Sequence, residues 1–165
     1  PLFFCINRYM ATLTQNKNFL SPVGFQFKIN SDTYPNLEYF AVSANLPDVS
    51  VSINEQPFRG TTVKYTGDTF TFSDLTIRVV LTEDMENYTE TFNWMQNILK
   101  SKRAEDFTED ATLLILNSHN NVSKEIKFKG VFPTNLGGVL FDSQADFAYA
   151  SSDITFAYTD FEFAK

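Results

Sequence analysis

The chain has 165 residues, of which 43% are hydrophobic and 16% aromatic, a composition that suits one folded domain and excludes a disordered chain. Twenty acidic against 13 basic residues give a net charge of −7, which argues against ordinary DNA binding because that depends on clustered Lys and Arg. No run approaches the ~20 apolar residues that span a bilayer, so we expect no membrane partner.

The first 18 residues are kept apart from the fold. An apolar stretch, PLFFCINRY, precedes Met10, where a natural start would fit. We interpret residues 1–18 as an N-terminal arm or a non-native extension, and residues 19–165 as a single domain. Because Cys5 is the single cysteine, we expect neither an internal disulfide nor a cysteine-rich metal site.

Alternating apolar and polar residues predict strands through the first half of the chain. The segment VGFQFKIN, residues 23–30, has the period of a half-buried strand. Residues 38–53 predict two more strands around a break at Pro47, which cannot donate to a ladder. Between residues 69 and 81 the apolar phase changes, which predicts a bulge near Ser73 and Asp74.

Residues 84–99 predict one amphipathic helix. Acidic residues open this segment and basic residues follow it, which matches the helix dipole. We expect its apolar residues to be buried against a sheet, with Trp94 in the core. The stripe consists of Met85, Tyr88, Phe92, Met95 and Leu99, widened by Trp94 and Ile98.

The second half returns to strands. An exposed connector at 100–110 leads to a short buried strand at 111–118 and an alternating strand at 122–132. The last strand, within 152–163, changes phase after Tyr158, which implies a second bulge or burial of both faces. The predicted fold class is mainly β, a curved antiparallel sandwich or barrel with the helix at about 84–99 packed against it.

Catalytic motifs are nearly absent. His119 stands alone in the polar turn NSHNN, and the carboxylates of AEDFTED, residues 104–110, fit a solvated charge cluster. The segment TNLGG lacks the lysine and the helix of a phosphate-binding loop. We therefore expect no enzyme activity, no catalytic residues, no cofactor and no metal.

One segment is unusually specific for a chain without visible chemistry. In KFKGVFPTNLGGVLFD, residues 127–142, Pro133 is expected to terminate ladder pairing and Asn135 to satisfy backbone groups locally. The two glycines admit a positive φ or a close backbone approach. We interpret Pro133, Thr134, Asn135, Gly137 and Gly138 as a structural corner.

This corner resembles one near the C-terminus of tail tube proteins from contractile-tailed, T-even-type bacteriophages, a family that includes tube-initiator relatives of the baseplate hub. The resemblance continues in TGDTFTFSDLTIRVVLTEDMENYTETFNWM, residues 66–95, and in YFAVSANLPDVSV, residues 39–51. Order and spacing agree over roughly residues 19–163.

The resemblance implies a structural virion protein made in the cytoplasm of a bacterial host. It would self-assemble into hexameric rings that stack as the phage tail tube and contact the sheath and the baseplate hub. Genomic DNA would pass through during ejection without stable binding. The joined sheets of neighbouring subunits would line the channel, with an acidic lumen as the candidate arrangement, formed by Asp142, Asp146, Asp153, Asp160 and Glu162.

Residues 54–68 are the candidate ring-stacking loop, with Phe58 as an apolar anchor and Arg59 and Lys64 as complementary charges. An ordinary exposed hairpin fits this segment equally well.

Other functions remain open at this point. The chain also suits a tube initiator of the baseplate hub or the inner tube of a contractile injection system. A small β-sandwich that binds a ligand would instead need an exposed aromatic platform and would be monomeric.

Overall fold

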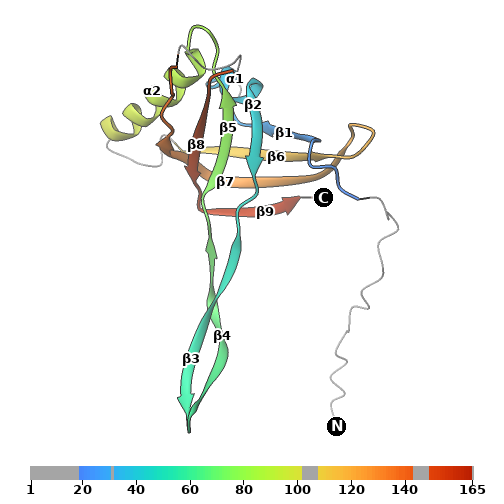
Figure 1. The fold of residues 1–165 in the computed structure, drawn as a ribbon, viewed down its shortest axis with the longest axis vertical. Coiled ribbons are helices and arrows are strands. Elements are labelled where there is room, and N and C mark those ends of the chain that lie inside the picture. Colours follow the sequence, from blue (N-terminus) through green and yellow to red (C-terminus); the bar gives the residue numbers. More distant parts are fainter. Residues whose placement is uncertain (1–18, 31, 102–107, 143–148, 165) are drawn as a thin grey trace.

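Two crossed layers of strands and a long projecting hairpin make up the molecule (Figure 1). The computed structural model describes residues 19–30, 32–101, 108–142 and 149–164. Residues 1–18, which include Cys5, lie outside these ranges, as do most of AEDFTED and Asp146. The elements are β1 Phe25–Lys28, α1 Pro35–Tyr39, β2 Ala41–Asn45, β3 Val49–Phe58, β4 Thr61–Phe72, β5 Leu75–Val80, α2 Glu86–Lys100, β6 Glu109–Leu116, β7 Val122–Leu136, β8 Ser151–Ala157 and β9 Asp160–Ala164.

Strand β7 belongs to both layers of the body. The antiparallel order is β1-β6-β7-β8-β5-β2, and β9 also pairs with β7. The first part of β7 pairs with β6 and β9, whereas its last residues pair with β8. In Figure 1 the strands β1, β6, β7 and β9 run across β2, β5 and β8. The predicted antiparallel, mainly β class with a packed helix is confirmed, as an open pair of layers instead of a closed barrel.

At both predicted changes of apolar phase the chain passes from one strand to another in a different sheet or layer. At Ser73 and Asp74 the chain leaves β4, which pairs with β3 in a separate two-stranded sheet, and enters β5 in the body. After Ala157 it leaves β8, and β9 then pairs with the first part of β7. The sequence therefore indicated an irregularity at both places, but the structure has a break between two strands there instead of a bulge within one strand.

The core lies between the two layers and under α2. Its residues alternate along the strands with half-buried or exposed positions, as expected for strands with one face in the core. Trp94 is 1% exposed; its ring stacks on Tyr34 at 4.4 Å between centroids and meets Phe156 at 6.0 Å. The buried apolar residues are Phe27, Ile29, Leu37, Leu75, Ile77, Val79, Trp94, Ala111, Leu113, Leu114, Ile126, Phe128, Val131, Ile154 and Phe156.

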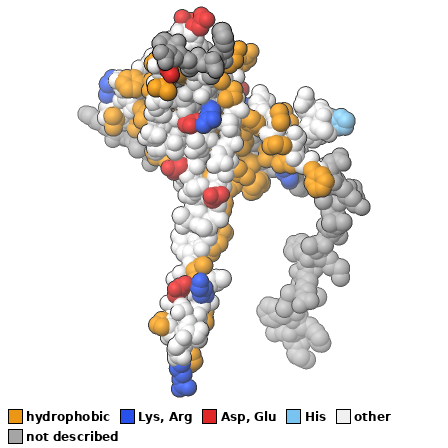
Figure 2. Space-filling view, viewed as in Figure 1, with side chains coloured by type: hydrophobic (Ala, Val, Ile, Leu, Met, Phe, Trp, Pro, Cys, Tyr) orange, Lys and Arg blue, Asp and Glu red, His pale blue; other side chains and the backbone are white. Residues whose placement is uncertain are grey.

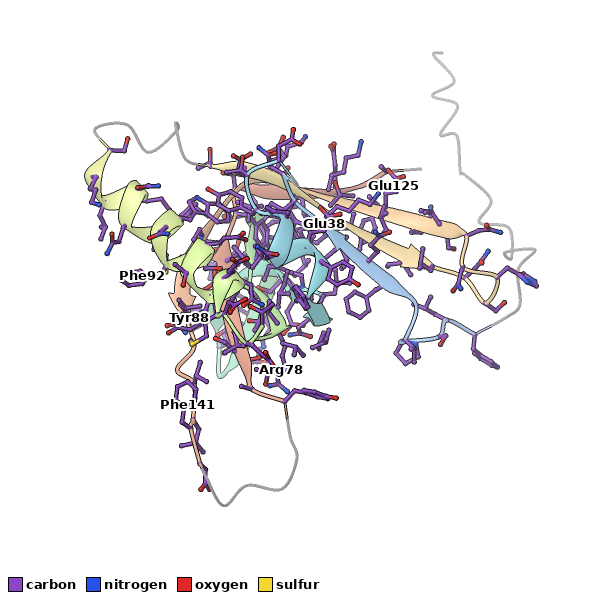
Figure 3. All side chains as sticks on the ribbon, turned by 90° about the horizontal axis from the view of Figure 1, so that it is seen from above. Glu38, Arg78, Tyr88, Phe92, Glu125 and Phe141 are labelled. Atoms are coloured by element: carbon purple, nitrogen blue, oxygen red, sulfur yellow. The ribbon has the colours of Figure 1, made fainter. Side chains whose placement is uncertain are left out.

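The buried face of α2 differs from the predicted one. Asn87, Thr91 and Trp94 face the body, whereas Leu99 is 85% exposed and Phe92 is 48% exposed. Two hydrogen bonds compensate for burying the polar side chains of Asn87 and Thr91 on this face. The Asn87 amide donates to the Val80 carbonyl at 2.7 Å, and the Thr91 hydroxyl donates to the Asn87 carbonyl at 3.1 Å. Figure 3 shows Phe92 pointing away from the sheet layers. We call Tyr88, Phe92, Met95 and Leu99 the α2 outer stripe.

Candidate assembly surfaces

The β3–β4 hairpin, here called the arm, extends away from the body as a two-stranded ribbon (Figure 1). Almost all of its residues are exposed, including many large apolar ones. An isolated two-stranded hairpin is marginally stable in water, and exposed apolar patches mark interaction surfaces. The arm is therefore a candidate interaction surface. Its exposed apolar residues are Val49, Val51, Ile53, Phe58, Val63, Tyr65 and Phe70.

The base of the arm is fixed to the body by an aromatic cluster. Phe72 meets Phe161 at 5.4 Å and Tyr158 at 6.1 Å between ring centroids. The Tyr158 hydroxyl donates a hydrogen bond of 2.8 Å to the Ser73 carbonyl. On the opposite strand, the Asp48 amide donates to the Ser73 hydroxyl at 2.7 Å. The direction of the arm is thus set by the body and not by a flexible linker.

Midway along the arm, an irregular pairing makes Gly67 necessary. Ser52 lies opposite three β4 residues, Gly67 to Thr69, because the register shifts between Val51 and Ile53. The Ser52 carbonyl oxygen lies 2.6 Å from where a Cβ on Gly67 would stand. A side chain there would force the two strands apart.

The far part of the arm carries an apolar face and the guanidinium of Arg59. Phe58, Val63 and Tyr65, together with Gln56, line a shallow hollow of about 260 Å³. Arg59 and Gly60 form the two-residue turn, with φ of 43° and 87°, the pattern of a type I′ hairpin. The Arg59 guanidinium lies 5.8 Å from the Phe58 ring centre and makes no ion pair within the described residues. We call Phe58, Arg59, Val63 and Tyr65 the arm tip.

The candidate ring-stacking loop is therefore strand over most of its length. The structure places Phe58 and Arg59 together at the tip, as the sequence interpretation grouped them. Lys64 differs, because it pairs across the strands with Glu55, and its ammonium forms an ion pair with that carboxylate at 3.3 Å. Cross-strand partners share a face and neighbours alternate, so Lys64 lies on the face opposite to Val63 and Tyr65.

The structural corner works differently from the prediction. Strand β7 continues through it, and Pro133 lies opposite Phe156 in the ladder with β8 instead of ending the pairing. The proline is tolerated because this part of β7 pairs on one side only, so no amide is needed on the other. The Thr134 hydroxyl donates to the Thr155 carbonyl at 3.1 Å, and Asn135 pairs opposite Thr155 through the ladder.

The two glycines of the corner have different surroundings. The Gly137 amide donates to the Asp153 carbonyl at 2.8 Å, and a Cβ on Gly137 would stand 2.8 Å from that same oxygen. A Cβ on Gly138 would meet nothing within 4 Å. Neither glycine is among the described residues with positive φ. The position with φ of +62° is Gly130, just before β7 leaves its first partners. A glycine inside a strand pattern was the available signal for it.

The acidic lumen candidates that the structure describes lie on different elements. Asp153 lies on β8, and its carboxylate accepts two hydrogen bonds from Arg78 at 2.7 and 3.0 Å, which lower the pKa of Asp153. Glu162 lies on β9 and forms an ion pair with Lys129 at 3.1 Å. The Asp160 carboxylate accepts the Phe161 amide at 2.8 Å. Asp142 is exposed in the β7–β8 connection, and Asp146 lies outside the described residues.

Among the described residues, no group of three His, Cys, Asp or Glu is placed to hold a metal ion. His119 lies in the exposed turn between β6 and β7, where its amide bonds to the Asn117 side chain at 2.9 Å. The described helices include none long and apolar enough to span a membrane.

The fold is that of chains found in contractile injection systems. Neither a protein-family model nor a curated protein sequence matches this chain significantly. Solved structures do match over nearly the full length, at identities low enough that they establish the fold alone. The fold expected from the tail tube resemblance is confirmed by these matches.

Three of these structures show the range of sequence identity and structural similarity. One belongs to the sheath-tube complex of an extracellular contractile injection system in its extended state, with 19% identity and a TM-score of 0.69 over 90% of this chain and 93% of that one. The tube-terminating cap of the anti-feeding prophage gives 16% identity and a TM-score of 0.70 over 95% and 98%. An Hcp protein gives 8% identity and 0.54 over 84% and 91%.

Proposed function

We propose that this chain is a structural subunit of the tube in a contractile tail-like particle. The observation that carries the proposal is the arm, a ribbon with many exposed apolar side chains that no other described element covers, on a body whose fold matches chains of such particles. Both the ribbon and the free edges of the sheet layers would be protected by neighbouring copies. The subunits form rings of six, as the tail tube resemblance implies, and the rings stack into a conduit.

The α2 outer stripe suits a second kind of contact. It is apolar, extends over most of the helix, and combines exposed Phe92 and Leu99 with half-buried Tyr88 and Met95. In this proposal the helix is part of the outer wall, where the stripe would contact sheath subunits, and the end of the tube would contact the baseplate hub. The particle is assembled in a bacterial cytoplasm, where this chain is made.

Two cargoes are compatible with such a conduit. The sequence resemblance favours a phage tail tube through which the genome is ejected. The solved structures of similar fold favour the inner tube of an injection system, since the sheath-tube and cap structures come from such systems. A tube initiator of the baseplate hub is the third variant, supported by a chain of similar fold in a baseplate structure, with a TM-score of 0.61.

Assembly of the purified chain tests the proposal. We expect rings or tubes by electron microscopy and fast-sedimenting species in ultracentrifugation as the protein concentration rises, or after preformed tail ends are added as seeds. A particle that stays monomeric at high concentration, with and without seeds, would contradict a tube role. That outcome would favour the small ligand-binding β-sandwich instead.

A further inference from the structure

A hollow of about 350 Å³ lies between the two end strands of the sheet order, β1 and β2. Strand β1 pairs only with β6 and β2 pairs only with β5, so each has an unpaired edge among the described strands. Helix α1, which lies between these strands in the sequence, forms the third wall. The hollow therefore belongs to a side of the body where an edge of each layer is open.

Glu38 is the charged residue among those that line the hollow. Its Oε2 atom is buried and has no hydrogen-bond partner among the described residues, whose ion pairs do not include Glu38. Lys28 of β1 does not supply the missing charge, because it follows Phe27 and its side chain lies on the opposite face of the strand. Burying part of a carboxylate without a donor is unfavourable, so the single subunit leaves this group unsatisfied.

The walls of the hollow suit a long basic side chain. Phe25, Phe27 and Pro35 provide apolar surface for a methylene stem, and the Glu38 carboxylate would receive the charged head. The Tyr39 ring, which is 82% exposed, is accessible to the same cation. An apolar or acidic side chain would leave the carboxylate unpaired, so the hollow favours a cation.

We propose that the hollow receives a lysine side chain from the neighbouring copy in the same ring, and that its ammonium pairs with Glu38. This inference rests on the proposed tube function, in which neighbouring copies cover the open strand edges beside the hollow. The neighbour contributes the cation that one chain lacks, so the site is complete only between two copies.

Lysine is the expected cation because neither described arginine is available on the body. Arg78 is held by Asp153, and Arg59 lies at the arm tip. Figure 2 shows the basic side chains of the visible face standing apart from one another, so one side chain and not a basic patch would enter the hollow. The exposed lysines without an ion pair among the described residues are Lys28, Lys100, Lys124 and Lys127.

The proposal gives Glu38 opposite effects in the free subunit and in the ring. In the free subunit its buried charge lowers stability, whereas in the ring the pair with lysine holds two copies together. Glu38→Gln keeps the shape of the side chain and removes the charge. We therefore expect this variant to melt at the same or a higher temperature than the unchanged protein, although it forms rings less readily. A residue that only supports the fold would lower the melting temperature instead.

Sedimentation across a concentration series measures ring formation in the full chain. We expect the concentration at which half of the protein is in rings to rise about tenfold or more in Glu38→Gln. Glu90→Gln is the matched control, because Glu90 also has a buried oxygen without a partner among the described residues but does not line the hollow. It should form rings as the unchanged protein does.

A second measurement identifies the partner. Rings assembled from a mixture of isotope-labelled and unlabelled chains are treated with a carbodiimide, which joins a carboxylate directly to a lysine amine as an amide. Mass spectrometry should find Glu38 joined to one of the exposed lysines of a differently labelled copy. Replacing that lysine by Gln should weaken ring formation as Glu38→Gln does.

Two outcomes would overturn the inference while the tube function stands. In the first, the unchanged protein forms rings and Glu38→Gln forms them at the same concentration. In the second, rings form but Glu38 is joined to no lysine of another copy. If the unchanged protein forms no rings, with or without seeds, the proposed function itself has failed.

Discussion

Gly137 and Gly138 are neighbours in sequence but differ in what they contact. A methyl group on Gly137 would press against the Asp153 carbonyl at 2.8 Å, whereas one on Gly138 would meet open space. We expect Gly137→Ala to lower the free energy of unfolding by about 1–3 kcal/mol, the usual cost of overpacking. Gly138→Ala should leave it unchanged. Chemical denaturation of both variants measures the difference, and equal stabilities would show that β7 and β8 lie farther apart.

Tyr34 makes stability depend on alkaline pH. Burial raises its pKa to about 12, helped by the charges of Glu109 and Glu90. Because this value lies above the usual one near 10, neutral Tyr34 stabilises the folded state below pH 10, and that contribution is lost as pH rises toward 12. Tyr34→Phe, which cannot ionise, should therefore lose stability less steeply over this range. Tyr39→Phe, at an exposed ring, is the control and should follow the unchanged protein. Identical slopes for all three proteins would contradict this role of Tyr34.

At the scale of elements, α2 offers a direct test of which face is buried. Trp94→Ala removes a ring that is 1% exposed, and we expect it to cost about 3–5 kcal/mol of stability. Leu99→Ala, at a position 85% exposed, should change stability by no more than about 0.5 kcal/mol. Thermal melting distinguishes the two. A large loss of stability in Leu99→Ala, measured on the isolated subunit, would indicate that Leu99 is buried, as the sequence first predicted.

The elements differ in how far the sequence specifies them. Strands β1, β5 and β8 were predictable because alternation directly reports a half-buried face. The α2 helix was predictable, but its orientation was not, since Asn87 and Thr91 turn inward through hydrogen bonds that no periodicity records. The α1 helix has five residues, too few for a period.

The candidate surfaces were predicted less completely than the strands. Phe58 and Arg59 lie in an exposed hairpin, which the sequence allowed, and their role in ring stacking stays a prediction. The length of the arm was missed, since polar residues on an uncovered ribbon resemble a loop. Glu83 and Asp84, which are exposed in the turn before α2, were noted only as helix-dipole charges.

For the whole molecule, charge bears on what passes through the proposed conduit. With a net charge of −7, the assembled protein should bind double-stranded DNA negligibly at physiological salt, because few counterions would be released. Filter binding or anisotropy across a salt series measures this. Tight binding that weakens steeply as salt rises would contradict a passive conduit.

A related prediction concerns two acidic lumen candidates that form ion pairs within the subunit. Asp153 and Glu162 are already paired with Arg78 and Lys129, so lysine at either position would also repel a neighbouring cation. If these side chains line the channel, Asp153→Lys and Glu162→Lys should impair delivery while rings still form. Loss of ring formation would instead place them at a subunit contact.

Strand β7 has a mechanical consequence. Its 15 residues are a continuous backbone that pairs with β6 and β9 in one layer and with β8 in the other. A force that slides one layer past the other therefore loads many of its hydrogen bonds together instead of unzipping them one at a time. The subunit should transmit an axial thrust as a stiff block, and yielding should begin at the two-stranded arm.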